Sequence, residues 1–318
     1  MDVKELEDYC GIAKYDEYDE SVEELKTLLP EFKDKVRCGF ELEGNWGESL
    51  YDVKVGKRTE TVYSLDQLHA FIEDAAGSQG GLFDTLSYVY EDGSVDTELV
   101  TQPLRVDEIL PSLRLWMNVL SDCGVAVDSY EGAGCHMTVS AGVGMPLYVK
   151  ANVEQIVRYF APALLYFACD QDMSRRDPDY YELNGSPIIR LSENRTLNGI
   201  TYKYSTVHFK TFGRVSGFEF RYPDPTEPTR LYAVAVLNMA ILLKAIKITI
   251  KHGGVFKIKN KRMRMNNRVY GRFVNRIDIS DYRDLITIMA GELIEFLADE
   301  IEEISGLNVK RWRDYTER

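Results

Sequence analysis

The stretch KVRCGFELE, residues 35–43, alternates apolar side chains with polar or small ones. Apolar residues stand at positions 36, 38, 40 and 42, which is the period of a β-strand with one buried face. Residues i and i+2 of a strand project from the same face, so Glu41 and Glu43 would lie roughly 6–7 Å apart. The stretch therefore predicts a strand that presents two carboxylates side by side.

Two neighbouring carboxylates on such a strand have two interpretations. Like charges on a partly apolar surface are costly unless something neutralises them, and a divalent cation such as Mg²⁺, which prefers oxygen ligands, would do so. Alternatively, Glu41 and Glu43 lie on a solvent-exposed face, where glutamate is ordinarily found. This stretch alone leaves both interpretations open.

Three further fragments carry ligand-type side chains on expected strands. DGSVDTELV (residues 92–100) places acids on both sides of an Asp-Gly turn, which is typical of a β-hairpin. GAGCHMTVS (132–140) places His136 on a strand after glycines, and GFEFR (217–221) alternates Glu219 with Arg221. A structural histidine and a surface ion pair remain the simpler alternatives. Together, the fragments suit one sheet lined with metal ligands.

The rest of the chain predicts an α+β fold. Helices are expected over residues 21–29 (with Ser21 as N-cap and Pro30 closing it), 65–76, 106–123, 153–170, 231–250, 282–303 and after 309; strands are expected over 85–91, 97–101, 125–128, 135–140, 204–210 and 217–222. The strands come in clusters between helices, which favours an antiparallel sheet over a doubly wound parallel one.

GFELE, DGSVDTELVTQPL, GAGCHMTVS and GFEFRYPDP occur in this order along the chain. In that order they resemble motifs of the glutamine synthetase superfamily, and more closely its amidoligase branch of carboxylate–amine ligases. The resemblance covers about residues 36–246. It implies a curved, mostly antiparallel sheet that lines the active site, with helices on its outer face. The expected division is an acidic helical extension (1–35), a catalytic core (36–250) and a basic then helical C-terminal segment (251–318).

The resemblance also implies ATP and Mg²⁺ or Mn²⁺ as cofactors, and a small-molecule or peptide carboxylate and an amine as substrates. By position in the motifs, Glu43 and Glu98 would hold an ion near the substrate. Glu41, His136 and Glu219 would hold an ion bridging the ATP phosphates, and Asp92 is a looser match to another acidic ligand. Arg221 would contact the transferred phosphoryl group, which fits the need to neutralise charge during phosphoryl transfer.

The sequence departs from the family pattern in places. Thr138 stands where the family has a second histidine, and His208 corresponds loosely to a family asparagine. The family's substrate-binding arginines have several candidates here, because guanidinium groups bind carboxylates and phosphates through two oxygens. These candidates are Arg175, Arg176, Arg190, Arg195 and Arg214, and Arg214, seven residues before Arg221, is the preferred one.

Charge is unevenly distributed in this acidic chain of net charge −13. Residues 1–34 hold twelve Asp or Glu, whereas residues 244–276 hold eleven Lys or Arg and no acid. The basic stretch either meets acidic surface of the same or a neighbouring chain or binds a polyanion. The overall acidity argues against a nucleic acid-binding protein.

The remaining composition indicates a cytoplasmic protein. The N-terminus is acidic, without the positive region of a signal peptide, and no apolar run approaches the roughly 20 residues that span a bilayer. The five cysteines are scattered without a CxxC pair, which predicts free, buried thiols. The sequence leaves a homo-oligomer open.

Three functions follow from these patterns. The first is an ATP-dependent ligase that forms an amide through an acyl phosphate. The second is a non-catalytic descendant of the ligase fold that binds a partner, which Thr138 favours. The third is a phosphotransferase on the same fold. The chain contains no GxxxxGK[ST] phosphate loop, no GxSxG elbow and no HExxH site, so it lacks the motifs of three other enzyme classes.

Overall fold

Strand β1 (Arg37–Trp46) is an interior strand of the main sheet. The structure is a computed structural model, and it describes residues 15–47, 51–93, 95–127, 133–168, 206–252 and 283–313. Cys38, Phe40 and Leu42 are fully buried on one face of β1, which confirms the alternation predicted from the sequence. The strand continues three residues beyond Glu43.

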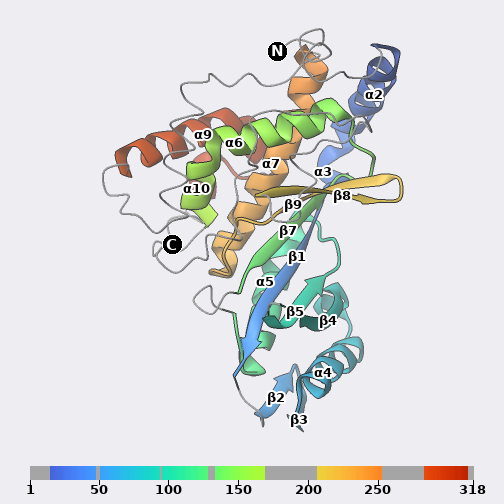
Figure 1. Ribbon diagram of the computed structural model, residues 1–318, viewed down its shortest axis with the longest axis vertical. Coiled ribbons are helices and arrows are strands. Elements are labelled where there is room, and N and C mark those ends of the chain that lie inside the picture. Colours follow the sequence, from blue (N-terminus) through green and yellow to red (C-terminus); the bar gives the residue numbers. More distant parts are fainter. Residues whose placement is uncertain are drawn as a thin grey trace.

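The main sheet is antiparallel throughout, with strand order β4-β5-β1-β7-β9-β8 (Figure 1). Its strands besides β1 are β4 (Leu86–Asp92), β5 (Val95–Thr101), β7 (Cys135–Ser140), β8 (Val207–Phe212) and β9 (Val215–Phe220). The short β6 (Val125–Ala126) pairs with the end of β1. A separate hairpin consists of β2 (Tyr51–Val55) and β3 (Arg58–Val62). With its helices, the molecule has the mixed helix and antiparallel-sheet architecture predicted from the sequence.

Helix α7 (Pro228–His252) packs against the apolar face of the sheet (Figure 1). Buried Asn238 on α7 donates a hydrogen bond to Met137 Sδ on β7 and accepts one from the Tyr222 hydroxyl just after β9. Helices α5 (Val106–Asp122), α6 (Leu147–Ala168) and α9 (Arg283–Ser305) contact α7 in turn. At the other end of the sheet, α4 (Leu65–Gly77) lies against β4. One face of the sheet is thus covered by helices.

By length and composition, α7 is also the one helix among the described residues that could cross a membrane. However, 78% of the apolar segment of this helix is buried inside the fold, and the core helix of a soluble protein can be equally long and apolar. Its apolar character is therefore accounted for by its place in the core.

The terminal helices join the same hydrophobic core. Leu25 and Leu28 of α2 (Tyr15–Leu28) and Phe32 of α3 (Phe32–Lys35), which follows the 3₁₀ turn η1 (Leu29–Glu31), are buried in it. At the C-terminal end, Trp312 of α10 (Val309–Arg313) is fully buried. A second 3₁₀ turn, η2 (Gly81–Thr85), precedes β4.

Several predicted boundaries were wrong. Helix α2 begins at Tyr15, so Ser21 lies inside it and is no N-cap, and α6 begins six residues before Val153. Strand β6 ends at Ala126 and not at residue 128. The β2–β3 hairpin was not predicted, although Gly56 in its turn has a φ of 59°, which favours glycine.

Cys38, Cys123 and Cys135 are free and buried, as predicted; Cys10 and Cys169 lie outside the described residues. At the start of the basic stretch, Lys244 and Lys247 on α7 bind Glu300 on α9, with N–O distances of 3.1 and 3.0 Å. These lysines therefore pair with a buried carboxylate of the same chain, and residues 253–276 lie outside the described part.

Candidate metal centre

Strand register brings the predicted ligands onto one face of the sheet. Glu41 on β1 lies opposite His136 on β7, and Glu43 lies opposite Glu98 on β5. Directly paired residues in neighbouring strands project from the same face. Glu219 on β9 is one strand further, opposite Thr138 of β7. We call this side of the sheet, which faces away from α7, the carboxylate face.

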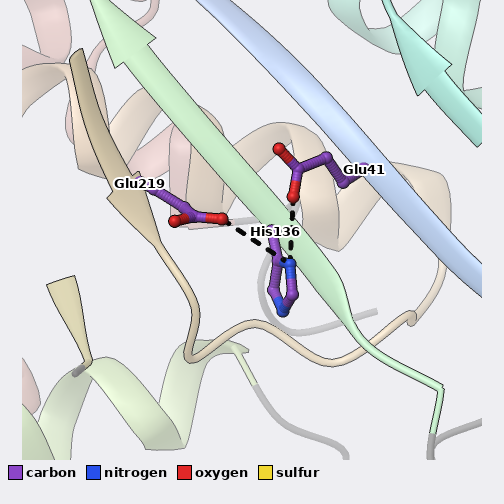
Figure 2. Close-up of side chains that lie close together, drawn as sticks. All are labelled: Glu41, His136 and Glu219. Atoms are coloured by element: carbon purple, nitrogen blue, oxygen red, sulfur yellow. Dashed lines mark hydrogen bonds and ion pairs between the residues drawn. The ribbon is translucent and has the colours of Figure 1, made fainter. Parts of the chain in front are cut away.

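The first group of ligands consists of Glu41, His136 and Glu219 (Figure 2). The His136 Nδ1 atom lies 3.1 Å from Glu41 Oε2 and 3.8 Å from Glu219 Oε1. One ligand atom from each residue falls within 4.8 Å of the others. These three side chains, from three adjacent strands, could bind one metal ion together.

The second group consists of Glu43, Asp92 and Glu98, whose ligand atoms also lie within 4.8 Å of one another. The Tyr90 hydroxyl donates a 2.6 Å hydrogen bond to Glu98 Oε1. Glu43 Oε1 lies 3.6 Å from His136 Nδ1, so the two groups are adjacent. The site is therefore a pair of neighbouring acidic groups.

Two cationic side chains border the first group. Lys210 on β8 places Nζ 3.3 Å from Glu41 Oε1 and 3.0 Å from Glu219 Oε1. Arg221 lies 2.9 Å from the same Glu219 oxygen. Burial alone would raise the pKa of Glu41, but the hydrogen bond from His136 and the charge of Lys210 lower it to about 2. Glu41 is therefore ionised at neutral pH and able to bind a cation.

The residues present fit a divalent cation. Five carboxylates and one imidazole make up the two groups, and such oxygen-rich sets suit Mg²⁺ or Mn²⁺. Glu219 is 1% exposed, and its buried Oε2 has no hydrogen-bond partner among the described residues, which leaves an acceptor for an ion. A Cβ at Gly134 would lie 2.6 Å from Glu43 Oε2, so glycine leaves the space that this carboxylate occupies.

Of the arginines and the histidine predicted to bind substrate or phosphate, some lie at the site and others do not. Arg221 lies in the site, and His208 on β8 is paired with Glu219 in register. Arg214 does not reach the site: it is exposed in the turn between β8 and β9, at the opposite end of β9 from Arg221, about 20 Å away by the rise of a strand. The preference for Arg214 is thereby corrected. Arg175, Arg176, Arg190 and Arg195 lie outside the described residues.

Two site residues, Lys210 and Tyr90, were not predicted. Lys210 follows His208 by two positions, and this spacing on a strand would have placed both on the same face. Tyr90 on β4 is paired with Glu98 on β5, and this pairing depends on the register of the β4–β5 hairpin. Neither residue carries a motif of its own.

The pKa of Glu98 predicts how metal binding depends on pH. Burial raises this pKa to about 7, and the charges of Glu41 and Glu43 add to the effect, while the Tyr90 hydrogen bond opposes it. A bound ion requires the deprotonated carboxylate, so we expect the Mn²⁺ affinity of the second group to rise about tenfold per pH unit up to about pH 7 and then level off. Calorimetric Mn²⁺ titrations at several pH values measure this.

The raised pKa of Glu98 also affects the stability of the metal-free protein, and this effect has the opposite dependence on pH. The carboxyl of Glu98 ionises at a lower pH in the unfolded chain than in the folded one, so its contribution to the free energy of unfolding falls as the pH rises from about 4.5 to about 7.

For the Mn²⁺ titrations, Glu98→Gln is the control, because it should remove the pH dependence of Mn²⁺ binding. An affinity that does not change with pH below 7 in the wild-type protein would contradict the assignment.

Comparisons with known proteins give only a loose likeness. No protein-family model matches the chain, and no curated protein matches it. Among solved structures, a GmaS–ADP complex has a TM-score of 0.46 and 14% identity over 92% of this chain and 74% of that chain. The ligase PafA in complex with the prokaryotic ubiquitin-like protein Pup has a TM-score of 0.35 and 11% identity over 91% of this chain and 74% of that chain.

Proposed function

We propose that the protein is an ATP-dependent carboxylate–amine ligase that works with Mg²⁺ or Mn²⁺. The observation that carries this proposal is the pair of adjacent ligand groups, Glu41–His136–Glu219 and Glu43–Asp92–Glu98. Strand register aligns all of these residues except Asp92 on one face of the sheet. The resemblance of the motifs to glutamine synthetase-like ligases supplies the reaction class. The site supplies what such a reaction needs, which is concentrated negative charge for metal ions, bordered by two cations.

In the proposed reaction, an oxygen of the substrate carboxylate attacks the γ-phosphorus of ATP, and the bond to the β-phosphate oxygen breaks to release ADP. An amine then attacks the carbonyl carbon of the acyl phosphate, phosphate leaves, and the amine nitrogen loses a proton. The result is one amide, one ADP and one phosphate for each ATP.

The chain's own residues have distinct parts in this scheme. Glu41, His136 and Glu219 would hold an ion at the nucleotide phosphates, and Glu43, Asp92 and Glu98 would hold one near the substrate. Bound there, the ions would neutralise charge on the phosphoryl group as it moves. Arg221, whose side chain is largely buried and fixed by Glu219 at 2.9 Å, would present its guanidinium to the same group.

The proposal is tested in two steps. Calorimetry with a non-hydrolysable ATP analogue should show binding that requires Mn²⁺ or Mg²⁺. Incubation with ATP and a panel of carboxylates and amines should then yield ADP, phosphate and amide in equal amounts, measured by mass spectrometry.

Each other outcome contradicts the ligase. ADP with a stable phosphorylated product and no amide would identify a phosphotransferase. Absence of nucleotide binding under any metal condition would support a non-catalytic descendant of the fold that binds a partner, which the threonine at position 138 favours because the family has a histidine there.

A further inference from the structure

The ammonium group of Lys210 lies where the first ligand group would attract a metal ion. Its Nζ is 3.3 Å from Glu41 Oε1 and 3.0 Å from Glu219 Oε1, and both carboxylates belong to that group. The Lys210 side chain is only 28% exposed. Lys210 lies on the edge strand β8, two residues after His208, which is paired with Glu219 on β9. Lys210 is therefore a cation supplied by the fold to two candidate metal ligands.

The carboxylates of the site have different neighbours. Lys210 and Arg221 both contact Glu219, and Lys210 also contacts Glu41. Glu43, by contrast, lies near His136, and Glu98 accepts a hydrogen bond from the Tyr90 hydroxyl.

From these contacts of Lys210 we propose that it is a resident counter-ion of the first group that a divalent cation must displace in order to bind. A lysine ammonium and a divalent ion within a few ångströms of each other repel strongly at a site with little solvent. Binding of the ion therefore requires the flexible lysine side chain to move away from Glu41 and Glu219. The inference rests on the proposed function only in taking a divalent ion as the ligand of the site.

The displaced ammonium has a second role in this scheme. Lysine binds phosphate as a compact point charge on a flexible stem. A nucleotide whose phosphates contact the ion would offer Lys210 new oxygens close to those it left. Lys210 would thus weaken metal binding without nucleotide and strengthen nucleotide binding once metal is present.

The test is a titration of the full chain with Mn²⁺, in which binding is measured by calorimetry and by the electron paramagnetic resonance signal of free Mn²⁺. Lys210→Met should raise the Mn²⁺ affinity of one site about tenfold to a hundredfold in the absence of nucleotide. At saturating Mn²⁺, the same variant should bind a non-hydrolysable ATP analogue more weakly than the wild type. A merely structural lysine would not produce these two opposite shifts.

Lys247→Met is the matched control. Lys247 also binds two carboxylates, Glu300 at 3.0 Å and Glu303 at 2.8 Å, and is 31% exposed, but it lies between α7 and α9 away from the site. Its replacement should leave both affinities unchanged. If Lys210→Met fails to fold, Lys210→Gln keeps a polar chain of similar length without the charge and should show the same shifts.

Unchanged or weaker Mn²⁺ binding in a folded Lys210→Met or Lys210→Gln protein would overturn the inference. That failure is separable from failure of the proposed function. If the predicted metal and nucleotide shifts appear but no carboxylate and amine are joined, the ligase proposal fails while the role of Lys210 stands. If amide forms but the affinities do not shift, only the inference fails.

Discussion

Replacement of Glu219 by glutamine is expected to lower metal-dependent ATP turnover about a hundredfold to a thousandfold. The carboxylate is almost fully buried, and its Oε1 lies within 3.0 Å of both Lys210 and Arg221. Glutamine keeps the size of the side chain but removes the charge that would bind the ion and that holds Arg221 in place. The measurement is ADP release with Mg²⁺, together with a Mn²⁺ titration.

Glu60→Gln is the control for this experiment. Glu60 is an exposed strand residue on the β2–β3 hairpin, outside the main sheet, so the same chemical change there should leave turnover unaltered. Circular dichroism checks that the Glu219→Gln protein is folded. Turnover equal to that of the wild type in a folded Glu219→Gln protein would remove Glu219 from the site.

Phe40→Ala is expected to lower the free energy of unfolding by about 3–5 kcal/mol, because it leaves a cavity in the core. Phe40 is fully buried on the helix-covered face of β1, next in sequence to Glu41 on the carboxylate face. Since total stabilities are about 5–15 kcal/mol, the loss is large. Urea unfolding followed by circular dichroism measures it.

Tyr63→Ala provides the comparison for that loss. Tyr63 is 65% exposed, so removal of its ring should change the free energy of unfolding by no more than about 0.5 kcal/mol. Equal effects of the two substitutions would mean that Phe40 does not lie in the core. The expected contrast assigns a large contribution to stability to the helix-covered face of β1.

Local patterns predicted much of this arrangement. The alternation around Phe40 and Glu41 identified β1, because a period of two is visible in a few residues. The Asp92-Gly93 turn identified the β4–β5 hairpin for a similar reason. The resemblance of the motifs to glutamine synthetase-like ligases then implied the ligands Glu41, Glu43, Asp92, Glu98, His136 and Glu219, which the structure gathers into two groups.

What the sequence did not reveal depends on pairing between distant strands. Glu41 and His136, which stand 95 positions apart, were grouped only through the family resemblance, and Lys210, which reaches Glu41 across 169 positions, was not predicted at all. No local pattern encodes such a register. Arg214 was preferred because it is near Arg221 in sequence, yet seven residues along a strand span about 20 Å. On an extended strand, two residues that are close in sequence can therefore have side chains that lie far apart in space.

One contact at the margin of the sheet limits how copies of this chain could join. Strand β4 forms the end of the strand order, and Glu73 on α4 accepts a 2.8 Å hydrogen bond from the Val89 amide. An incoming strand would need that amide, and it would meet a carboxylate there instead. Such blocking of an unpaired rim is a known protection against aggregation. Self-association by continuation of the sheet past β4 is therefore disfavoured, and an assembly of this protein would have to use another surface.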